Sequence, residues 1–143
     1  MPIDISTDRD RLDIPMIHDF LSNRSTWARG IDLDTVQRSI RHALCFGAYD
    51  TATGRQVGFA RVITDQATFA YLVDVFVLET HRGQGVSRRL MEAVMACPAL
   101  ARLRRFTLVT STAAGLYARF GFTPLHAPQA HMEILRPDVY RQG

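Results

Sequence analysis

The first half of the chain alternates between strand-like and helix-like patterns of apolar residues. Residues 2–6 alternate apolar and polar side chains, as a short strand does, and apolar residues recur at helical spacing over residues 14–21 and 36–44. Asp32 and Asp34 precede the second helical stretch and suit the start of a helix, where the helix dipole is positive. Further strand patterns follow at residues 45–49, 56–63 and 67–78. This half of the chain therefore predicts a strand, two helices and a meander of three antiparallel strands.

The second half of the chain predicts helices that alternate with short strands. Gly83 and Gly85 come before a helical pattern that starts at Val86 and runs to Pro98. A short apolar strand at residues 106–109, a helix over residues 112–120 and one or two strands within residues 122–134 complete the order. A helix between residues 78 and 106 is the usual crossover between parallel strands. The order βααβββαβαβ thus predicts an α/β fold with a mixed sheet and helices on its faces.

The composition fits one compact domain that spans residues 1–143. The 143 residues are 47% hydrophobic and 22% charged, which is enough apolar material for a single core without metal or disulfide cross-links. The most apolar stretch, residues 69–78, is far shorter than the roughly 20 residues that a membrane-spanning helix needs. The first residues lack the basic and apolar segments of a secretory signal, so the sequence predicts a cytoplasmic protein with no membrane partner.

Neither the cysteines nor the net charge indicates a metal site or a nucleic-acid partner. Cys45 and Cys97 lie far apart and have no cysteine or histidine at metal-ligand spacing, so both are interpreted as reduced thiols. The net charge of +3 includes 17 basic residues, all of them arginine, that are spread along the chain. Residues 102–105 contain three arginines with only Phe106 beside them, a pattern more typical of a solvated face than of a nucleic-acid binding surface.

One short segment has the residue types of an anion-binding loop. It lies where a strand gives way to a helix, and it reads Arg82-Gly83-Gln84-Gly85-Val86-Ser87. Unpaired backbone N–H groups and the helix dipole can hold a phosphate at such a point, and glycine lets a pyrophosphate approach the backbone. The same glycines also occur in ordinary turns. The nucleoside-triphosphate and dinucleotide loop motifs are both excluded, because the chain has no lysine and position 88 is arginine.

Two motifs in the second half resemble those of a known family. Residues 75–90 read VFVLETHRGQGVSRRL and resemble the coenzyme A signature of the GNAT superfamily of acetyltransferases, Arg/Gln-x-x-Gly-x-Gly/Ala after a long strand. Residues 115–122 read GLYARFGF and are similar to the Leu-Tyr-x-x-x-Gly-Phe segment of the same family. The order of the strands agrees over nearly the whole chain. The resemblance implies an N-acetyltransferase with a mixed, mostly antiparallel sheet of about six to seven strands and about four helices.

The resemblance also implies which residues bind acetyl-CoA. In the family, the backbone at residues 75–77 hydrogen-bonds the pantetheine arm, and the amides of residues 83–88 wrap the pyrophosphate. The implied set is Val75, Phe76, Val77, Arg82, Gly83, Gln84, Gly85, Val86, Ser87 and Arg88. Two positions depart from the family pattern: Ser87 replaces a glycine or alanine, and Thr110 stands where many members have an asparagine that contacts the cofactor arm. The contacts of these two side chains stay open.

Acetyl transfer from a thioester to an amine needs a neutral amine, a stabilised oxyanion and a proton for the departing thiolate. Tyr117 matches the tyrosine that serves as the general acid in the family, although a tyrosine on an amphipathic helix can also simply fill the core. The resemblance implies a backbone donor to the thioester oxygen among residues 75–77. Asp74 interrupts an apolar strand face, so it is either the general base or a structural carboxylate. Family members also deprotonate amines through chains of water.

The amine acceptor is expected to bind beside the first two helices, which form one wall of the acceptor cleft in the family. Trp27 and Tyr71 are the candidate substrate-binding residues, because an aromatic face attracts a cationic or aromatic amine. The expected acceptor is a small-molecule or peptide amine that attacks directly in a ternary complex. A non-catalytic acyl-CoA-binding or regulatory module on the same fold is the alternative. Homodimers are common in the family, but no sequence feature marks one here.

Overall fold

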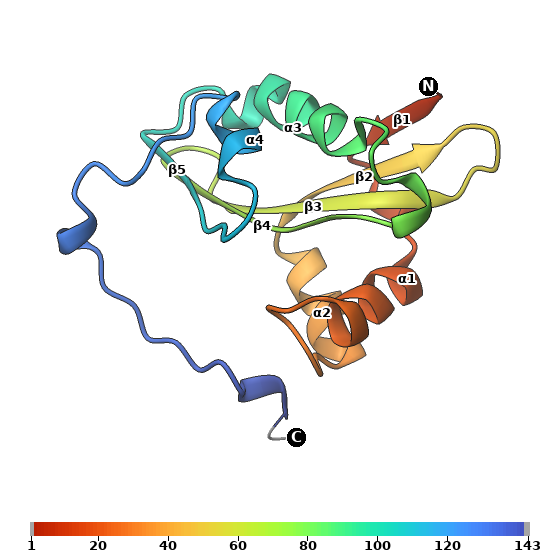
Figure 1. Cartoon of the computed structure of the whole chain (residues 1–143), viewed down its shortest axis with the longest axis horizontal. Helices are drawn as coiled ribbons and strands as arrows, with labels where there is room; N and C mark the ends of the chain where they lie inside the picture. The colour runs from red at the N-terminus through yellow and green to blue at the C-terminus, as the bar shows by residue number, and fades with distance from the viewer. Residues whose placement is uncertain (1, 142–143) are drawn as a thin grey trace.

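The structure, a computed structural model, describes residues 2–141 and contains one five-stranded sheet (Figure 1). Its strands are β1 (Ile3–Ser6), β2 (Leu44–Asp50), β3 (Gln56–Thr64), β4 (Phe69–Val77) and β5 (Arg105–Leu108). They lie in the order β1-β2-β3-β4-β5, and neighbours pair antiparallel except for β4 and β5, which are parallel. The sheet is therefore mixed and mostly antiparallel, as the sequence predicts.

The α-helices of the described residues are α1 (Ile14–Asp19), α2 (Leu33–Arg41), α3 (Val86–Ala96) and α4 (Ala114–Ala118). A π-helical turn, η2 (Phe20–Arg24), continues α1. The short 3-10 turns are η1 (Arg9–Arg11), η3 (Glu79–His81), η4 (Pro98–Leu100), η5 (Pro128–Ala130) and η6 (Val139–Arg141). Asp13 and Asp32 cap α1 and α2, because their side chains accept hydrogen bonds from the N–H groups of Met16 and Thr35. The longest helix, α3, supplies the crossover from β4 to β5.

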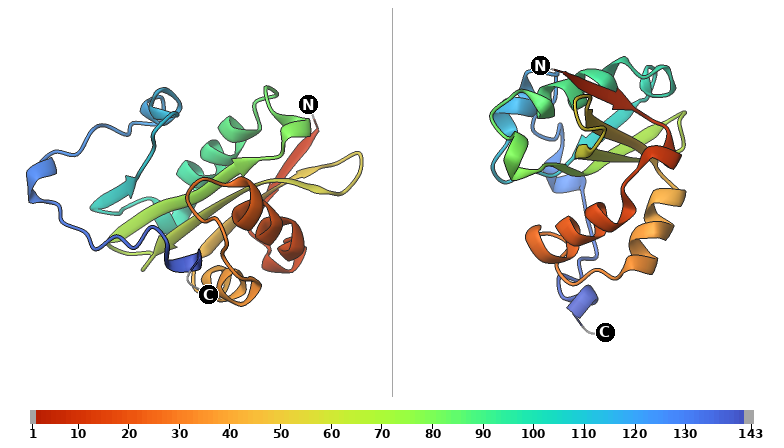
Figure 2. Two further views of the ribbon diagram at one scale, coloured as in Figure 1. Left: turned by 60° about the horizontal axis from the view of Figure 1, so that its bottom comes forward. Right: turned by 90° about the vertical axis from the view of Figure 1, so that its right-hand side faces the viewer.

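The helices cover the two faces of the sheet and give the molecule two apolar cores (Figures 1 and 2). Beneath α3 and α4, the core includes Val62, Leu72, Leu90 and Met91. Beneath α1 and α2, it includes Ile17, Val36, Phe59 and Phe76. Phe20 of η2 stacks on Phe76, with 3.9 Å between the ring centroids. Val62 and Phe59 of β3, three residues apart, thus point into different cores, as the two-residue period of a strand requires.

Strand β4 carries one extra residue opposite β3. Phe59 pairs with Phe76 and Arg61 pairs with Val73, so β4 advances by one residue more than β3 between the two pairs. Asp74 lies in this bulge with φ of 57°, in the left-handed region that few residues other than glycine adopt. The ladder with β5 involves only residues of β4 that precede the bulge. The remainder of β4 therefore has no strand of the described chain on its outer side.

The sequence prediction of six to seven strands is wrong. The sheet of residues 2–141 has five, because residues 122–134 form no strand. Residues 123–141 instead run as an extended segment, here called the arm, that contains three prolines. Proline lacks a backbone N–H and cannot donate to a ladder. Apolar composition alone does not make a strand, since a strand also needs a neighbour to pair with.

The remaining predicted elements are present, with ends that differ by a few residues. Helix α4 is shorter than the predicted helix over residues 112–120, because residues 110–113 form a turn that leads into it. In this turn Thr110 Oγ1 accepts a hydrogen bond from the N–H of Ala113 at 3.0 Å. None of the helices within residues 2–141 combines the length and the hydropathy that crossing a membrane requires.

Candidate functional site

The loop between β4 and α3 has the backbone that its glycines predict. Gly83 and Gly85 have φ of 75° and 78°, a region in which a Cβ atom is strained. A Cβ built on Gly83 would meet no atom within 4 Å, and one on Gly85 would meet only Arg88 Nη2, at 3.7 Å. The glycines are therefore required by the backbone conformation and not by crowding inside the protein. Because almost no atoms lie near the position of a Cβ at Gly83 and Gly85, the backbone there is accessible to a ligand.

The N-terminus of α3 offers a row of free amides. The N–H of Arg89 bonds to Gly85 O at 3.1 Å, whereas the N–H groups of residues 83–88 have no acceptor within the described part of the chain. These donors and the helix dipole favour an anion. An open pocket of about 240 Å³ lies in front of them, and its lining is Val77, His81, Arg82, Gly83, Gly85, Val86, Ser87, Arg88 and Leu116. Polyanion binding is the chemistry that this end of the site supports.

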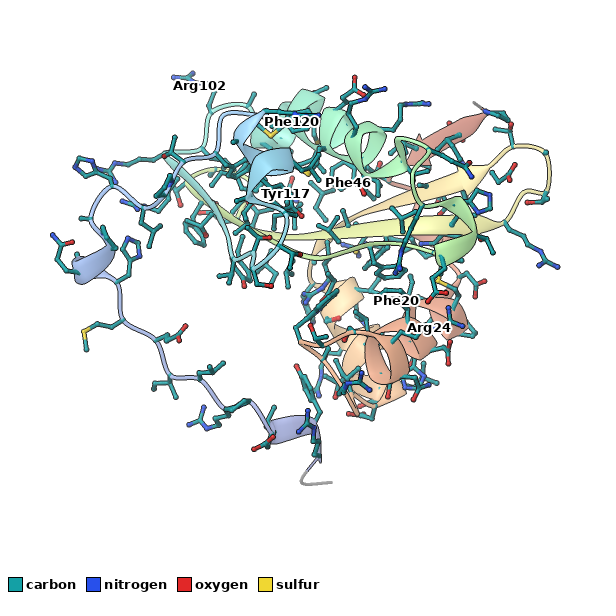
Figure 3. The ribbon with its side chains drawn as sticks, in the orientation of Figure 1. Phe20, Arg24, Phe46, Arg102, Tyr117 and Phe120 are labelled. Atoms are coloured by element: carbon teal, nitrogen blue, oxygen red, sulfur yellow. The ribbon has the colours of Figure 1, made fainter. Side chains whose placement is uncertain are left out.

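A second pocket, of about 350 Å³, continues from the first along the open part of β4. The two pockets share Val77, Arg82, Ser87 and Leu116 in their linings. The second pocket is further lined by Phe20, Arg24, Thr26, Trp27, Val75, Phe76, Ala113 and Tyr117. Figure 3 shows that Tyr117 comes from α4 on one side of the sheet, whereas Phe20 and Arg24 come from η2 on the other. The combined site can take a long ligand that starts at the α3 amides and ends between these layers.

Tyr117 belongs to the core and to the pocket at the same time. Its side chain is 9% exposed and meets the ring of Phe122 edge-on, with 6.2 Å between the centroids. Burial raises the pKa of the Tyr117 hydroxyl above its ordinary value, so the group is a neutral phenol at neutral pH. A neutral hydroxyl at the wall of a pocket is able to donate a proton. The core-filling and proton-donor interpretations of this residue are therefore compatible.

Asp74 connects the sheet to the loop that carries Trp27. Its Oδ1 accepts a hydrogen bond from Trp27 Nε1 at 2.7 Å, and its Oδ2 accepts one from Arg61 Nε at 2.9 Å. The Asp74 side chain is 7% exposed, while Trp27 is 48% exposed and lines the second pocket. Asp74 itself is not part of either pocket lining. The Asp74 carboxylate therefore fixes the indole of Trp27 at the pocket wall through a hydrogen bond, although the carboxylate itself does not line the pocket.

Besides Asp74, two predicted site residues, Gln84 and Tyr71, lie outside both pockets. Gln84 is exposed, and its Nε2 reaches only the carbonyl of Thr80, at 3.5 Å. Tyr71 lies opposite Ile63 in the sheet, on the part of β4 that precedes the bulge. The other predicted binding residues, Val75, Phe76, Val77, Arg82, Gly83, Gly85, Val86, Ser87, Arg88 and Trp27, all line one pocket or both.

The sequence patterns missed three lining residues from the first helical layer. Phe20, Arg24 and Thr26 enter the second pocket through the π-helical turn η2 and the loop after it. A π turn shifts the register of the helix, so helical spacing could not show which side chains face the sheet. His81, another lining residue, donates a hydrogen bond from Nε2 to Asp50 Oδ2 at 2.9 Å. This hydrogen bond lowers the pKa of Asp50 and joins the loop after β4 to the β2–β3 hairpin.

Cys45 is unsuited to nucleophilic chemistry. It is buried beneath α2, and its Sγ points at the carbonyl of Ile40 at 3.8 Å. Burial raises the pKa of the Cys45 thiol to about 11, so almost none of it is thiolate at neutral pH. Neither Cys45 nor Cys97 lines a pocket described above. The site therefore favours chemistry without a covalent cysteine intermediate.

The sequence matches a family model and a named relative over more than half of its length. Residues 41–124, which include both motifs, match the family model described as an acetyltransferase (GNAT) domain. The chain is 32% identical to a Gibberella zeae protein named as an acetyltransferase, over 80% of this chain and 75% of that protein.

Solved structures with the same fold include one close relative. A GNAT-family protein from Xanthomonas campestris is 58% identical, covers 96% of each chain and superposes with a TM-score of 0.93. A Mycobacterium tuberculosis protein crystallised in complex with CoA has a TM-score of 0.67 over 86% of this chain and 73% of its own, at 20% identity. The second likeness concerns the fold alone.

The Arg61–Asp74 pair should matter for stability far more than an exposed pair does. Arg61→Met leaves the Asp74 carboxylate, 7% exposed, without its cation, and we expect a loss of about 3–5 kcal/mol in the free energy of unfolding. Arg88→Met is the control, because Arg88 and Glu92 are 66% and 56% exposed and 3.8 Å apart, and such pairs contribute about 0–1 kcal/mol. Urea unfolding followed by the fluorescence of the single tryptophan measures both. Equal losses in the two variants would contradict the structural role of Asp74.

Proposed function

The chain belongs to the GNAT family of acetyltransferases, and from this we propose that it transfers the acetyl group of acetyl-CoA directly to a primary amine. The observation that carries the proposal is the continuity of the site. A row of unpaired amides at the N-terminus of α3 opens into a pocket that runs along the unpaired part of β4 to Tyr117. We infer that the acceptor is a small-molecule or peptide amine and that it reaches this pocket from the side of Trp27.

The residues around the loop suit the diphosphate of coenzyme A. In the proposal the amides of residues 83–88 hold the diphosphate, and the guanidinium groups of Arg82 and Arg88 add charge-assisted contacts. Arg82 is already oriented, since its Nε donates to Val77 O at 3.1 Å. The open space where a Cβ of Gly83 would lie supports the fit of the ligand to the backbone. Ser87 adds a hydroxyl to the same wall.

Acetyl-CoA supplies an activated thioester, and the chain supplies donors and acceptors around it. The amine nitrogen bonds to the thioester carbonyl carbon, and the carbon–sulfur bond breaks. A backbone N–H among residues 75–77 donates to the thioester oxygen as negative charge grows there. The Tyr117 hydroxyl gives its proton to the departing sulfur and regains one from solvent. The products are an amide and a free thiol.

Asp74 enters the proposal as an acceptor reached through water. Both of its oxygens already accept hydrogen bonds, from Trp27 and from Arg61, and it lies behind the indole. Each carboxylate oxygen has a second lone pair, so a water molecule can still donate to it. In the proposal the amine proton is passed to this water molecule and from there to bulk solvent. The same carboxylate holds Trp27 in position through its hydrogen bond to the indole. Arg61 and Trp27 thus keep the acceptor wall in place during the reaction.

Acetyl transfer should be visible as free thiol released from acetyl-CoA in the presence of an amine. We expect at least one class in a panel of amino acids, polyamines, arylamines and peptides to raise thiol release well above hydrolysis. Acetyl-CoA at about 100 times its Kd should also add roughly 2.7 kcal/mol to native stability, measured as a thermal shift. A shift without amine-dependent release would favour the non-catalytic acyl-CoA-binding module. Absence of both effects would overturn the proposed function.

Gly85→Ala should weaken acetyl-CoA binding beyond its effect on folding. Gly54→Ala is a matched control, because Gly54 has φ of 75° and lies in the β2–β3 turn with no atom within 4 Å of a Cβ. Both substitutions strain the backbone by about 1–2 kcal/mol. Only the substitution at Gly85 also places a methyl group on the pocket wall and disturbs the amides. We expect a reduced thermal shift with acetyl-CoA for Gly85→Ala and a normal shift for Gly54→Ala, and equal shifts would contradict the site.

Tyr117→Phe should lower kcat about 100-fold or more and leave acetyl-CoA affinity nearly unchanged. The neutral hydroxyl is the proton donor, and burial raises its pKa above the ordinary value of about 10. The donor form therefore persists through neutral and mildly alkaline pH, and the activity that depends on it falls only above this range. That decline should be absent from the pH profile of Tyr117→Phe. Tyr49→Phe is the control, because Tyr49 is buried outside both pockets. An unchanged kcat would remove the acid role.

A further inference from the structure

Arg24 is a cation at the wall of the second pocket without a close partner in its own chain. It is the last residue of the π-helical turn η2 and lines the pocket. Its nearest carboxylate belongs to Asp19, whose Oδ2 lies 3.7 Å from Arg24 Nε, beyond hydrogen-bond distance. Asp19 also accepts a hydrogen bond at Oδ1 from Asn23 Nδ2, at 2.8 Å. Within residues 2–141 the guanidinium of Arg24 therefore has five N–H donors and no hydrogen-bond acceptor.

Two other arginines close to the second pocket are already engaged. Arg61 Nε donates to Asp74 Oδ2 at 2.9 Å, and Arg82 Nε donates to Val77 O at 3.1 Å. Arg82 also lines the first pocket, where the proposed function assigns it to the diphosphate of acetyl-CoA. Arg24 lines the second pocket alone. It is therefore placed to contact the acceptor amine, and the cofactor loop does not compete for it.

The second pocket carries positive charge without a carboxylate to balance it. Its charged lining residues are Arg24 and Arg82, and no aspartate or glutamate is among the described residues that line it. Asp74 lies outside the lining and is paired with Arg61. A polyamine with a second ammonium group would meet two guanidinium groups and no anion here. The charges of the pocket thus favour an acceptor that carries a negative group.

The residues beside Arg24 suit the remainder of such an acceptor. Phe20, at the start of the same turn, stacks on Phe76 with 3.9 Å between the ring centroids, and both line the pocket. Trp27 and Thr26 add an exposed indole and an exposed hydroxyl to the same wall. Figure 3 shows that Phe20 and Arg24 both lie on the α1 and α2 side of the sheet. The pocket therefore offers aromatic surface next to a cation, which fits an apolar body with an anionic end.

The backbone that carries Arg24 is fixed, although its guanidinium is not. The N–H of Ser25 donates to Phe20 O at 2.9 Å and closes the π turn. The Ser25 hydroxyl donates to Leu21 O at 2.6 Å, and Ser25 is buried. Short π segments are frequent at functional sites. Because the turn is already ordered, a ligand that binds Arg24 has only the side chain to immobilise.

We propose that Arg24 binds an oxyanion of the acceptor, a carboxylate or a phosphate, and that the acceptor is an anionic primary amine. This inference rests on the proposed function and narrows its acceptor from amines in general to this class. Two parallel N–H groups of a guanidinium match two oxygens of either anion, so the contact sets the orientation of the acceptor as well as its charge. An acceptor anchored at Arg24 extends along a pocket whose other side carries Tyr117.

Matched acceptors test the charge that the pocket requires. The panel pairs free amino acids with their carboxamides, and aminoalkyl phosphates with the corresponding amino alcohols; spermidine is the cationic probe. We expect the anionic member of at least one pair to have a kcat/KM about 10- to 100-fold above that of its neutral partner, because hydrogen bonds to charged groups are strong. The two kinds of pair distinguish a carboxylate from a phosphate. Thiol release from acetyl-CoA measures each rate.

Substitution of Arg24 should affect the anionic acceptors selectively. Arg24→Met should raise their KM about 10- to 100-fold and change the KM of the neutral partners little. Arg24→Glu should shift the preference toward spermidine, because the charge of the wall is reversed. Arg29→Met is the matched control, since Arg29 is exposed in the same loop and lies outside both pockets. Far-ultraviolet circular dichroism verifies that each variant is folded.

The fluorescence of Trp27 gives a readout that does not depend on acetyl transfer. Trp27 is the single tryptophan of the chain and lines the same pocket, so titration of the panel compounds reports their binding directly. Binding of the anionic compounds should weaken in Arg24→Met and stay unchanged in Arg29→Met.

The two readouts separate the inference from the proposed function. Arg24-dependent binding of anions without any thiol release supports the anion site and contradicts acetyl transfer. Thiol release that prefers the neutral or cationic compounds, or equal KM values in Arg24→Met and Arg29→Met, overturns the inference and leaves acetyl transfer intact. Absence of both thiol release and Arg24-dependent binding overturns both.

Discussion

The extra residue in β4 is the constraint on which the site depends. Before the bulge, β4 has a neighbour on each side, β3 and β5; after it, only β3 remains. The unpaired edge of β4 then forms one wall of the second pocket, and the chain leaves β4 through the short turn η3 into the glycine loop and α3. Bulges bend a strand and increase its twist, which ends pairing on one side. Without this residue β5 could continue along β4 and fill the space that the pocket occupies.

Sequence patterns predicted the elements whose signals are local. The two-residue and helical periods located β2, β3, β4 and α3, and the crossover rule gave the parallel pairing of β5. Residues 122–134 were predicted to contain strands because they have the right composition. A strand, however, is a property of two segments, and composition does not reveal whether a partner lies within reach. The same reason explains why the extent of the sheet was overestimated while its type was predicted correctly.

The candidate site divides in a similar way between local and long-range features. The glycine loop was predictable because positive φ angles at 83 and 85 follow from the residues themselves. Tyr117 was found through a motif, and its pocket position depends on where α4 packs. Phe20 and Arg24 had no sequence signal, because the π turn displaces them from the helical pattern. The environment of Asp74 was predicted as apolar, yet its partners Arg61 and Trp27 come from two distant segments.

Asp74 keeps a strained backbone because two groups fix its side chain. A left-handed residue other than glycine persists where its surroundings leave it no alternative, and here a guanidinium from β3 and an indole from the loop after η2 both bind the carboxylate. The loop has its own anchor in Ser25, whose hydroxyl donates to Leu21 O and accepts from the N–H of Ala28. Trp27 is thus held by its hydrogen bond to Asp74 of the sheet, and the loop that carries it is held by the hydrogen bonds of Ser25. A ligand in the second pocket meets a wall already in position, so little ordering of the protein opposes its binding.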